Sequence, residues 1–386
     1  MKPPAVNNKN PFATKDQELL LRASLMDGAG AAGAWKEWKG AVDLEAELDS
    51  GSRRLLPLLY ANLKRLEVKD ELMGRLKGVY HKAWYRNQRL FSLAAGVLDY
   101  LRGKGVRTIV LKGIPMSMLY YRNNGVRPMH DIDVLVPASQ ALMAADLLKS
   151  AGWTLTGGEP PEALIMYRHS QEFAGESGID LDLHWRLIEG PPTECSDFWD
   201  RAVPVKVQDV PSYALDATDM LFHIIVHGVR WNPEPAIRWI ADAVTIMKSS
   251  GPQIDWRRII NHAKKYMVSL QLKEGLNYLY RNFQIFVPAA ALDEINGLPA
   301  SRFERFEYRL LIKNEDFGWL LGGGPVYLAE YLRTRKGGLP GAIPGFAGYL
   351  KFRMKKDNLR QLFFYLAARG IRMSKERILF FRKGVL

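Results

Sequence analysis

The sequence predicts an α+β fold in which a small mixed sheet lies between an N-terminal and a C-terminal helical region. Apolar residues recur every three or four positions over residues 16–101 and again after residue 216, which is the spacing of helices that bury one face. Between these regions, apolar residues gather in short β-branched runs that alternate with two helical segments. This order of elements is typical of a compact α/β unit with a mixed sheet.

The middle region opens with a strand, a helix and a second strand. VRTIVLKG (106–113) is a short β-branched run that ends in glycine, and it predicts a strand followed by a turn. PMSMLYYR (115–122) predicts a helix, because Pro115 suits a first helical turn. HDIDVLVP (130–137) alternates polar and apolar residues as a strand does, and it stops at a proline.

A second helix and further strands complete this region. SQALMAADLLKSAGW (139–153) predicts an amphipathic helix. FAGESGIDLDLHWRL (173–187) and VPVKVQDVPSYAL (203–215) are strand-like, and we expect them to add antiparallel strands to the same sheet. The chain is therefore divided into a helical region (1–104), an α/β core (105–215), a second helical domain (216–330) and a basic C-terminal segment (331–386).

Composition indicates a globular chain. Of its 386 residues 47% are apolar, so the chain can bury a sizeable core in two or three compact units. Its single cysteine, Cys195, excludes an intramolecular disulfide, and we therefore expect a cytoplasmic protein. The first residues contain Pro, Asn and Lys where a signal peptide would need an apolar segment. No apolar run approaches the roughly 18 residues of a membrane-spanning helix, so we expect no transmembrane segment.

The formal net charge of +13 is concentrated in the C-terminal segment. Residues 331–386 contain 14 Lys and Arg but only two Asp and Glu, which leaves the rest of the chain nearly neutral. This distribution argues against a nucleic-acid groove over the whole surface. The basic segment can bind RNA, an acidic peptide or anionic lipid through cations interleaved with aromatic rings. The alternative, which we favour, is that the aromatic rings pack on the body while the charges stay solvated.

Two aspartates in the strand HDIDVLV are the most informative feature of the sequence. A strand repeats its side-chain direction every two residues, so Asp131 and Asp133 project from one face while Ile132 and Val134 point into the core. Asp is depleted in strands and costly to bury unpaired, so core packing does not explain the pattern. Carboxylates at this spacing suit Mg²⁺, with Mn²⁺ as the second choice. The alternative without metal is a strand-end pair that caps a turn or pairs with Arg127.

A third carboxylate would complete a two-metal site. The later strand GIDLDLHW carries Asp180, Asp182 and His184, all on one face by the same alternation. From the residues alone either aspartate can be the third ligand, and a solvated strand edge is the alternative. In a two-metal site one metal activates the attacking oxygen and the other holds the leaving pyrophosphate.

The turn LKGIPMS (111–117) is a candidate for phosphate binding. Gly113 lets backbone N–H groups approach a phosphate, and the N-terminus of the following helix favours an anion. Lys112 and Ser117 can add a charge and a hydroxyl, and Arg127 can bind a triphosphate oxygen. Each of the three has a structural alternative: Lys112 as a solvent-facing lysine, Ser117 as a first-turn helix residue, and Arg127 as a partner that orients the acidic strand.

Two residue pairs in the second helical domain are weaker candidates. His223 and His227 are four residues apart on a helix, but H-I-I-V-H lacks the glutamate of the zinc motif H-E-x-x-H. We therefore expect hydrogen-bonded helix histidines rather than metal ligands. Arg238 and Asp242 are also four apart, and we expect them to brace the helical domain.

Residues 106–137 together with IDLDLHW resemble the uncharacterised nucleotidyltransferase family of the DNA polymerase β superfamily. That family shows an LKG turn, an R-x-x-x-D-[IV]-D-[LV]-L-V strand and a later D-L-H-W strand. The likeness is strong over roughly residues 105–190 and weaker in the helices that follow. The resemblance implies that Asp182 is the third carboxylate. It also implies a nucleotidyltransferase core followed by a helical domain that helps to bind substrate.

One departure from the superfamily pattern concerns the phosphate turn. The wider superfamily has Gly-Ser or Gly-Gly at the start of the helix after the first strand. Here Gly113 is followed by Ile114 and Pro115, which leaves the residues that bind phosphate open.

The resemblance implies an enzyme that moves a nucleoside monophosphate from an NTP to a hydroxyl, phosphate or amine acceptor with Mg²⁺. The acceptor is expected to be a peptide or a small molecule, and nucleic acid is not favoured. A second hypothesis is a transferase that uses a nucleotide sugar to tailor a peptide or phosphopeptide, because related family members occur beside peptide-tailoring enzymes. A third is a non-catalytic nucleotide-binding or nucleic-acid-binding protein, which rests on the basic segment.

Overall fold

The structure is a computed structural model, and it describes residues 11–43, 48–156, 165, 167–175, 178–189, 196–230, 237–312, 324–334 and 342–368. Cys195 and residues 335–341 and 369–386 of the basic segment lie outside the described residues. Among the helices in these ranges, none has both the length and the apolar character that crossing a membrane would require.

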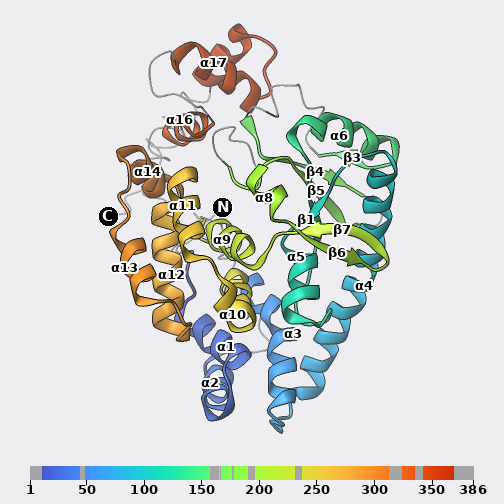
Figure 1. Ribbon diagram of the computed structural model, residues 1–386, viewed down its shortest axis with the longest axis vertical. Coiled ribbons are helices and arrows are strands. Elements are labelled where there is room, and N and C mark those ends of the chain that lie inside the picture. Colours follow the sequence, from blue (N-terminus) through green and yellow to red (C-terminus); the bar gives the residue numbers. More distant parts are fainter. Residues whose placement is uncertain are drawn as a thin grey trace.

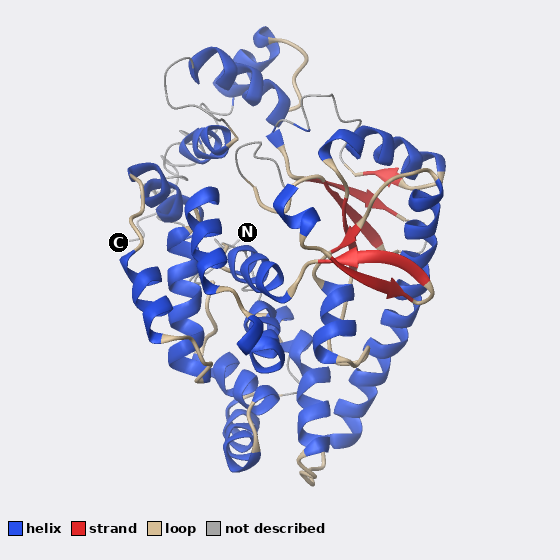
Figure 2. Cartoon of the chain, viewed as in Figure 1, coloured by secondary structure: helices blue, strands red, loops and turns tan. Residues whose placement is uncertain are grey.

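In the described part of the chain, seven strands form one mixed sheet, which lies to one side of the helices α9 to α13, residues 217–297 (Figure 1, Figure 2). The strand order is β3-β4-β5-β2-β1-β7-β6. Strands β2 and β5 are parallel, as are β1 and β7, and the other neighbours are antiparallel. With its flanking helices, this sheet confirms the predicted α+β class. The strands are β1 (Ile109–Val110), β2 (Asp131–Leu135), β3 (Thr154–Leu155), β4 (Ser170–Ala174), β5 (Asp180–His184), β6 (Val203–Val207) and β7 (Val210–Ala214).

The strand-like stretches of the second half of the core lie in two hairpins. Gly178 (φ +68°) lies between β4 and β5, and Gln208 (φ +52°) lies between β6 and β7. The prediction of antiparallel strands is correct within each hairpin. It is wrong where β5 and β7 join β2 and β1, because those pairs are parallel. A parallel pair needs a crossover connection, and the chain between β2 and β5 is long enough to provide one.

Among the described residues, four helices precede the sheet, and the last of them covers one face of it. The first begins with a capping box, in which the Thr14 side chain accepts from the Gln17 N–H and the Gln17 side chain accepts from the Thr14 N–H. The last and longest runs along the sheet (Figure 1). The helices are α1 (Lys15–Leu25), α2 (Gly28–Ala41), α3 (Ser50–Arg65) and α4 (Met73–Gly103).

Short helices connect the strands, and a helical domain follows them. The predicted helix 115–122 is a single turn, α5 (Gly113–Pro115), that continues as a π-helix over Met116–Tyr121. Such π-helical segments are often found at functional sites. The remaining helices are α6 (Ala141–Ser150), α8 (Ser196–Asp200), α9 (Ala217–Gly228), α10 (Arg238–Ser250), α11 (Trp256–Tyr266), α12 (Ser269–Phe283), α13 (Ala289–Gly297), α14 (Arg302–Glu307), α16 (Gly324–Arg333) and α17 (Ala342–Arg353).

One face of the sheet packs against α4 and α6. Val110, Ile132 and Val134 are fully buried on this face. They form one apolar cluster with residues of α4 such as Leu98 and residues of α6 such as Leu148. Ile132 and Val134 therefore point into the core, as the alternation in β2 predicts.

The opposite face of the sheet belongs to a larger apolar core. Ile109, Leu111 and Leu135 share this core with the N-terminal helices and with α9 to α13. Because side chains alternate along β2, Asp133 points to the same face as Leu135. The acidic face of the sheet therefore turns toward the helical body.

Part of the basic C-terminal segment is integrated into the fold. Arg333 is buried and forms a salt bridge with Glu307. Tyr331 and Tyr349 are buried against each other, whereas Phe363 and Phe364 are 67% and 60% exposed. Of the described aromatic rings in this segment, some thus pack on the body and others face solvent.

Candidate metal and nucleotide site

Two carboxylates and an imidazole converge at the centre of the sheet. Parallel pairing of β2 with β5 sets Asp133 beside Asp182, and the two-residue period of β5 brings His184 to the same face. The Nε2 atom of His184 lies 3.1 Å from Oδ1 of Asp133 and 3.0 Å from Oδ2 of Asp182. One potential ligand atom from each residue lies within 4.8 Å of the others, which is close enough for all three to hold one cation.

The cluster keeps its carboxylates ionised. Burial opposes the ionisation of Asp133, but the Lys112 ammonium and the His184 ring outweigh it and hold the pKa of Asp133 below its usual range. Burial also opposes ionisation of Asp182, and the charge of His184 again prevails, so the pKa of Asp182 is lowered. Burial favours neutral His184, but Asp182 and the hydrogen bonds to both carboxylates raise the pKa of this ring. The result is a compact group in which two ionised carboxylates are balanced by the charges of Lys112 and His184.

Asp131 lies at the rim of this cluster. It begins β2, is exposed where Asp133 is buried, and pairs across the parallel ladder with Asp180. Partial desolvation of its carboxylate by the surrounding chain and then the neighbouring charge of Asp133 raise the pKa of Asp131. Among the described residues, the compact ligand group contains His184 where the sequence predicts Asp131. The alternation of side chains along a strand predicts which face of the sheet each residue points to, but it does not predict how deeply the residue is buried.

Lys112 takes part in the cluster. Its Nζ atom lies 2.5 Å from Oδ1 of Asp133, and the side chain is 18% exposed. Its backbone has φ +48°, a region that non-glycine residues occupy only at a cost. In the structure, Lys112 is therefore not the solvent-facing lysine of the structural alternative. A strained backbone holds this ammonium against the acidic strand.

Gly113 allows a close approach between the turn and the chain that enters β2. A Cβ atom at this position would lie 2.7 Å from Sδ of Met129 and 3.0 Å from a guanidinium nitrogen of Arg127. Both neighbours are themselves buried. The glycine is thus required by contact and not by a special backbone angle.

Replacing Gly113 with alanine is expected to destabilise the fold by about 1–3 kcal/mol, the usual cost of overpacking. Thermal unfolding of purified protein provides the measurement. The matched control is Gly78→Ala in α4, where an added Cβ meets nothing within 4 Å. That substitution should raise stability by about 0.5–1 kcal/mol through helix propensity. Equal midpoints for the two variants would contradict this account of Gly113.

Ser117 and Arg127, the two other candidates for phosphate binding, make contacts with other protein groups. Ser117 is fully buried, with its Oγ atom 4.0 Å from Sδ of Met129. Arg127 is 5% exposed and makes a two-pronged salt bridge to Asp242 at 2.8–3.1 Å. These contacts support the structural alternative for each residue, and we do not assign either to the nucleotide.

The Arg127 salt bridge ties the acidic strand to the helical domain. Asp242 also accepts a hydrogen bond from the Tyr121 hydroxyl at 2.9 Å. Arg238 donates instead to the carbonyl of Pro128, at 2.7 Å. The i, i+4 spacing suggests that Asp242 pairs with Arg238, but the salt bridge of Asp242 runs to the segment before β2.

Asn87 is a positioning residue that sequence reasoning missed. It is fully buried in α4, and its amide donates to the carbonyls of Asn124 and Arg127 at 2.6 and 2.9 Å. Its side-chain oxygen accepts from the Met129 N–H at 3.0 Å. One side chain thus fixes the loop that leads into β2. An asparagine at a core position of a long helix is the only sequence signal for this role.

His223 in α9 differs from the expectation of a hydrogen-bonded ring. His223 is 1% exposed, and neither of its ring nitrogens has a hydrogen-bond partner among the described residues. Its ring meets that of His227 edge to face, with centroids 5.8 Å apart. In the same part of the structure, Nδ1 of His184 is also buried without a partner. Sequence spacing gives no indication of this deficit.

Stability is expected to fall as the pH drops below about 6.5, the usual histidine pKa. Burial and then the Lys112 charge hold the pKa of His223 well below that value, so only the unfolded chain binds this proton. The slope is at most about 1.4 kcal/mol per pH unit for such a histidine. His184, whose pKa is raised, acts with the opposite sign. In urea unfolding from about pH 7.5 to 5.5, the free energy of unfolding should therefore fall less steeply for His223→Leu than for the parent chain. Identical slopes would refute a neutral His223.

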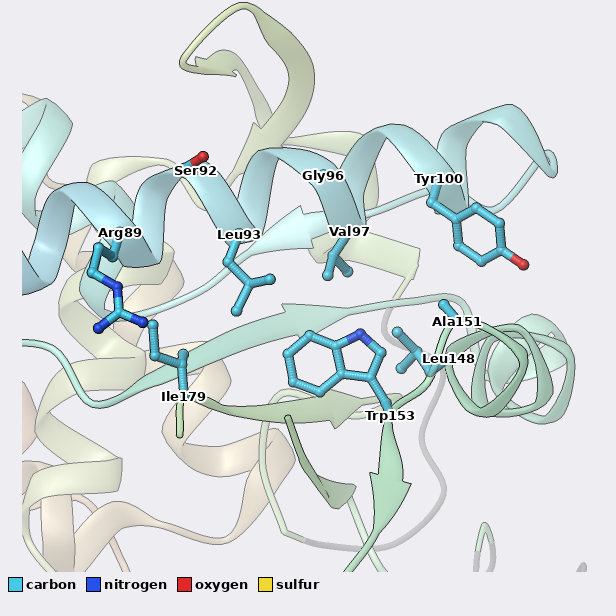
Figure 3. Close-up of a pocket in the computed structure, with 10 residues that line it drawn as sticks. All are labelled: Arg89, Ser92, Leu93, Gly96, Val97, Tyr100, Leu148, Ala151, Trp153 and Ile179. Carbon is cyan, nitrogen blue, oxygen red and sulfur yellow. The ribbon is translucent and has the colours of Figure 1, made fainter. Parts of the chain in front are cut away.

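A separate cavity of about 550 Å³ lies between α4 and the segment that follows α6 (Figure 3). Arg89, Val97 and Tyr100 line one side, and Leu148 and Trp153 line the other. Val97, Leu148 and Trp153 belong to the apolar cluster on the sheet face that turns away from Asp133. This cavity is therefore distinct from the acidic site.

The chain is similar to known proteins over a range of residues that includes the site. Residues 51–284 match the model of a family described as "Uncharacterised nucleotidyltransferase", which covers more than half of the chain. No curated protein matches the sequence. Among solved structures, the chain is similar to an antigenic nucleotidyltransferase-like protein from Paracoccidioides brasiliensis, at 11% identity and a TM-score of 0.33. That similarity covers 53% of this chain and 95% of the other.

Proposed function

Because the chain belongs to the uncharacterised nucleotidyltransferase family, we propose that it transfers a nucleoside monophosphate from an NTP to a hydroxyl, phosphate or amine acceptor with Mg²⁺. One observation carries the proposal. Asp133 and Asp182 lie in register on adjacent parallel strands, with potential ligand atoms within 4.8 Å of each other and of His184. Paired ionised carboxylates next to a glycine turn are what a metal-bound polyphosphate requires.

The donor set fits a divalent cation. Both carboxylates are held in their ionised form, which metal binding needs. We assign Asp133 and Asp182 as the principal ligands and Asp131, at the open end of β2, as a further one. Bound there, Mg²⁺ would neutralise the charge of the phosphates and acidify the attacking group. Mn²⁺ is included in the tests below because it prefers the same carboxylate ligands as Mg²⁺.

The protein's own groups orient the donor. The backbone N–H groups of the Gly113 turn and the ammonium of Lys112 would bind the β- and γ-phosphates. In the reaction the acceptor atom bonds to the α-phosphorus, and the bond from that phosphorus to the pyrophosphate oxygen breaks. Asp182 would orient the acceptor side of the site. Lys112 would exchange its contact with Asp133 for a phosphate when a cation neutralises the aspartate.

The test is a thermal-shift panel of the four NTPs and several nucleotide sugars, each with and without Mg²⁺ or Mn²⁺. The true donor should stabilise the fold by mass action, with about 2.7 kcal/mol at a hundred times its Kd, and only when metal is present. Incubation with α-labelled NTP and with sugar-labelled donors then reveals which label reaches the acceptor. Stabilisation by nucleotide sugars alone would replace the proposal with the glycosyl-transfer hypothesis. Absence of any metal-dependent shift would refute both.

A further inference from the structure

His223 has the features of a side chain that binds a ligand. Its ring is 1% exposed, and both ring nitrogens lack a hydrogen-bond partner among the described residues. Buried polar groups are nearly always hydrogen-bonded, because leaving one unsatisfied costs its full desolvation. A leucine or phenylalanine would fill the same space without this cost. The imidazole is therefore not explained by packing.

Helix α9 carries this ring to a position where the charges of Lys112, His184 and Asp133 act on it. Helix α9 follows β7 after two residues, and it lies between the sheet and α12 (Figure 1). Phe222 and Ile224, the neighbours of His223 in α9, belong to the same core as Ile109 and Leu111. Those strand residues share the face of Asp133. His184 on that face also has a buried nitrogen, Nδ1, without a partner in the described chain.

The charges around His223 favour an anion. Burial is the main reason that its pKa lies well below the usual range, and the cations Lys112, His184 and Arg230 add to this effect. Asp133 is the one anion among the main charges that act on the ring. A neutral imidazole has one N–H donor and one acceptor nitrogen. Such an N–H can donate to a phosphate oxygen.

We propose that His223 is a substrate-binding residue, whose ring N–H donates a hydrogen bond to a phosphate oxygen of the donor held at the Lys112–Gly113 turn. This inference rests on the proposed function. The ring of His223 also contacts that of His227 edge to face, at 75° between ring planes. No proton is transferred in this role, and the ring remains neutral throughout.

The experiment measures the binding of inorganic tripolyphosphate with Mg²⁺ by titration calorimetry on the full chain. This probe carries the phosphates of every NTP and is independent of the base. We expect His223→Leu to bind it about tenfold more weakly, the factor that corresponds to the loss of one hydrogen bond. The unliganded His223→Leu variant should unfold at the same temperature or higher, because an unsatisfied polar group has been removed.

Two further variants make the result specific. His223→Asn and His223→Gln each keep an amide donor, near Nδ1 and Nε2 respectively, and the one that matches the bonding nitrogen should recover part of the affinity. The matched control is His262→Leu in α11, since His262 is also buried but bonds to Asp219 at 3.0 Å. That variant should lose thermal stability and keep its affinity for the probe.

The outcomes separate this inference from the proposed function. Unchanged affinity in His223→Leu, or a fall in its unfolding temperature as large as that of His262→Leu, would overturn the role of His223 alone. If the parent chain itself does not bind tripolyphosphate with Mg²⁺, the phosphate site and the inference both fail.

Discussion

Replacing Asp133 with asparagine is expected to lower the rate of nucleotidyl transfer on the order of 10³-fold, because the cation would lose its central ligand charge. Asp133 is 3% exposed and contacts both Lys112 and His184. Asparagine keeps the shape and one acceptor oxygen, so the local hydrogen bonds can persist. The charge that attracts the cation is lost. The rate with the best donor and saturating Mg²⁺ is the quantity to measure.

The control for this variant is a second Asp→Asn change outside the site. Asp146 is an exposed residue of α6, and Asp146→Asn should retain full activity. Circular dichroism must show that the Asp133→Asn chain remains folded. Asp182→Asn and Asp180→Asn extend the test, because only the loss of a metal-binding carboxylate should reduce apparent Mg²⁺ affinity. Full activity in Asp133→Asn would refute the metal site.

Replacing Arg127 with methionine is expected to destabilise the fold by about 3–5 kcal/mol, the usual effect of removing one partner from a buried ion pair. Asp242, 3% exposed, would remain as a buried charge without its guanidinium. The Tyr121 hydroxyl still donates to it but carries no charge. Urea unfolding gives the free energy change, and an unchanged m value would show that the unfolding transition is comparable.

A double variant distinguishes the ion pair from simple packing. Arg127→Met combined with Asp242→Leu should be more stable than Arg127→Met alone, because no charge remains buried. Arg102→Met provides the surface control, since Arg102 pairs with Asp99 and both side chains are more than half exposed. Its stability should change little. If the two buried substitutions simply add, the coupling between Arg127 and Asp242 is absent.

The sequence predicts the parts of the site that depend on local periodicity. Alternation in HDIDVLV places Asp131 and Asp133 on one face, and in the structure Ile132 and Val134 point to the other. The same rule groups Asp182 with His184 on β5. The helix–strand–helix order is correct for the same reason, because apolar spacing is a local property.

Contacts between distant residues are what the sequence does not predict. Arg127 and Asp242 are 115 residues apart, and Asn87 forms hydrogen bonds with residues 37–42 positions further along the chain. The parallel register of β2 with β5 decides that Asp133, and not Asp131, lies beside Asp182. Local patterns do not encode such a register. The lack of hydrogen-bond partners for the His223 nitrogens among the described residues depends on every group around the ring, and only a three-dimensional structure shows those groups.

The core shared by the two helical regions has a consequence for synthesis on the ribosome. The Tyr278 hydroxyl donates to Glu18 at a separation of 260 residues, and the Trp239 indole donates to the carbonyl of Pro11. The first helices therefore emerge long before their packing partners exist. Until then the part of α1 that contacts α10 stays uncovered, and nascent chains with such uncovered faces are prone to association and are substrates for chaperones.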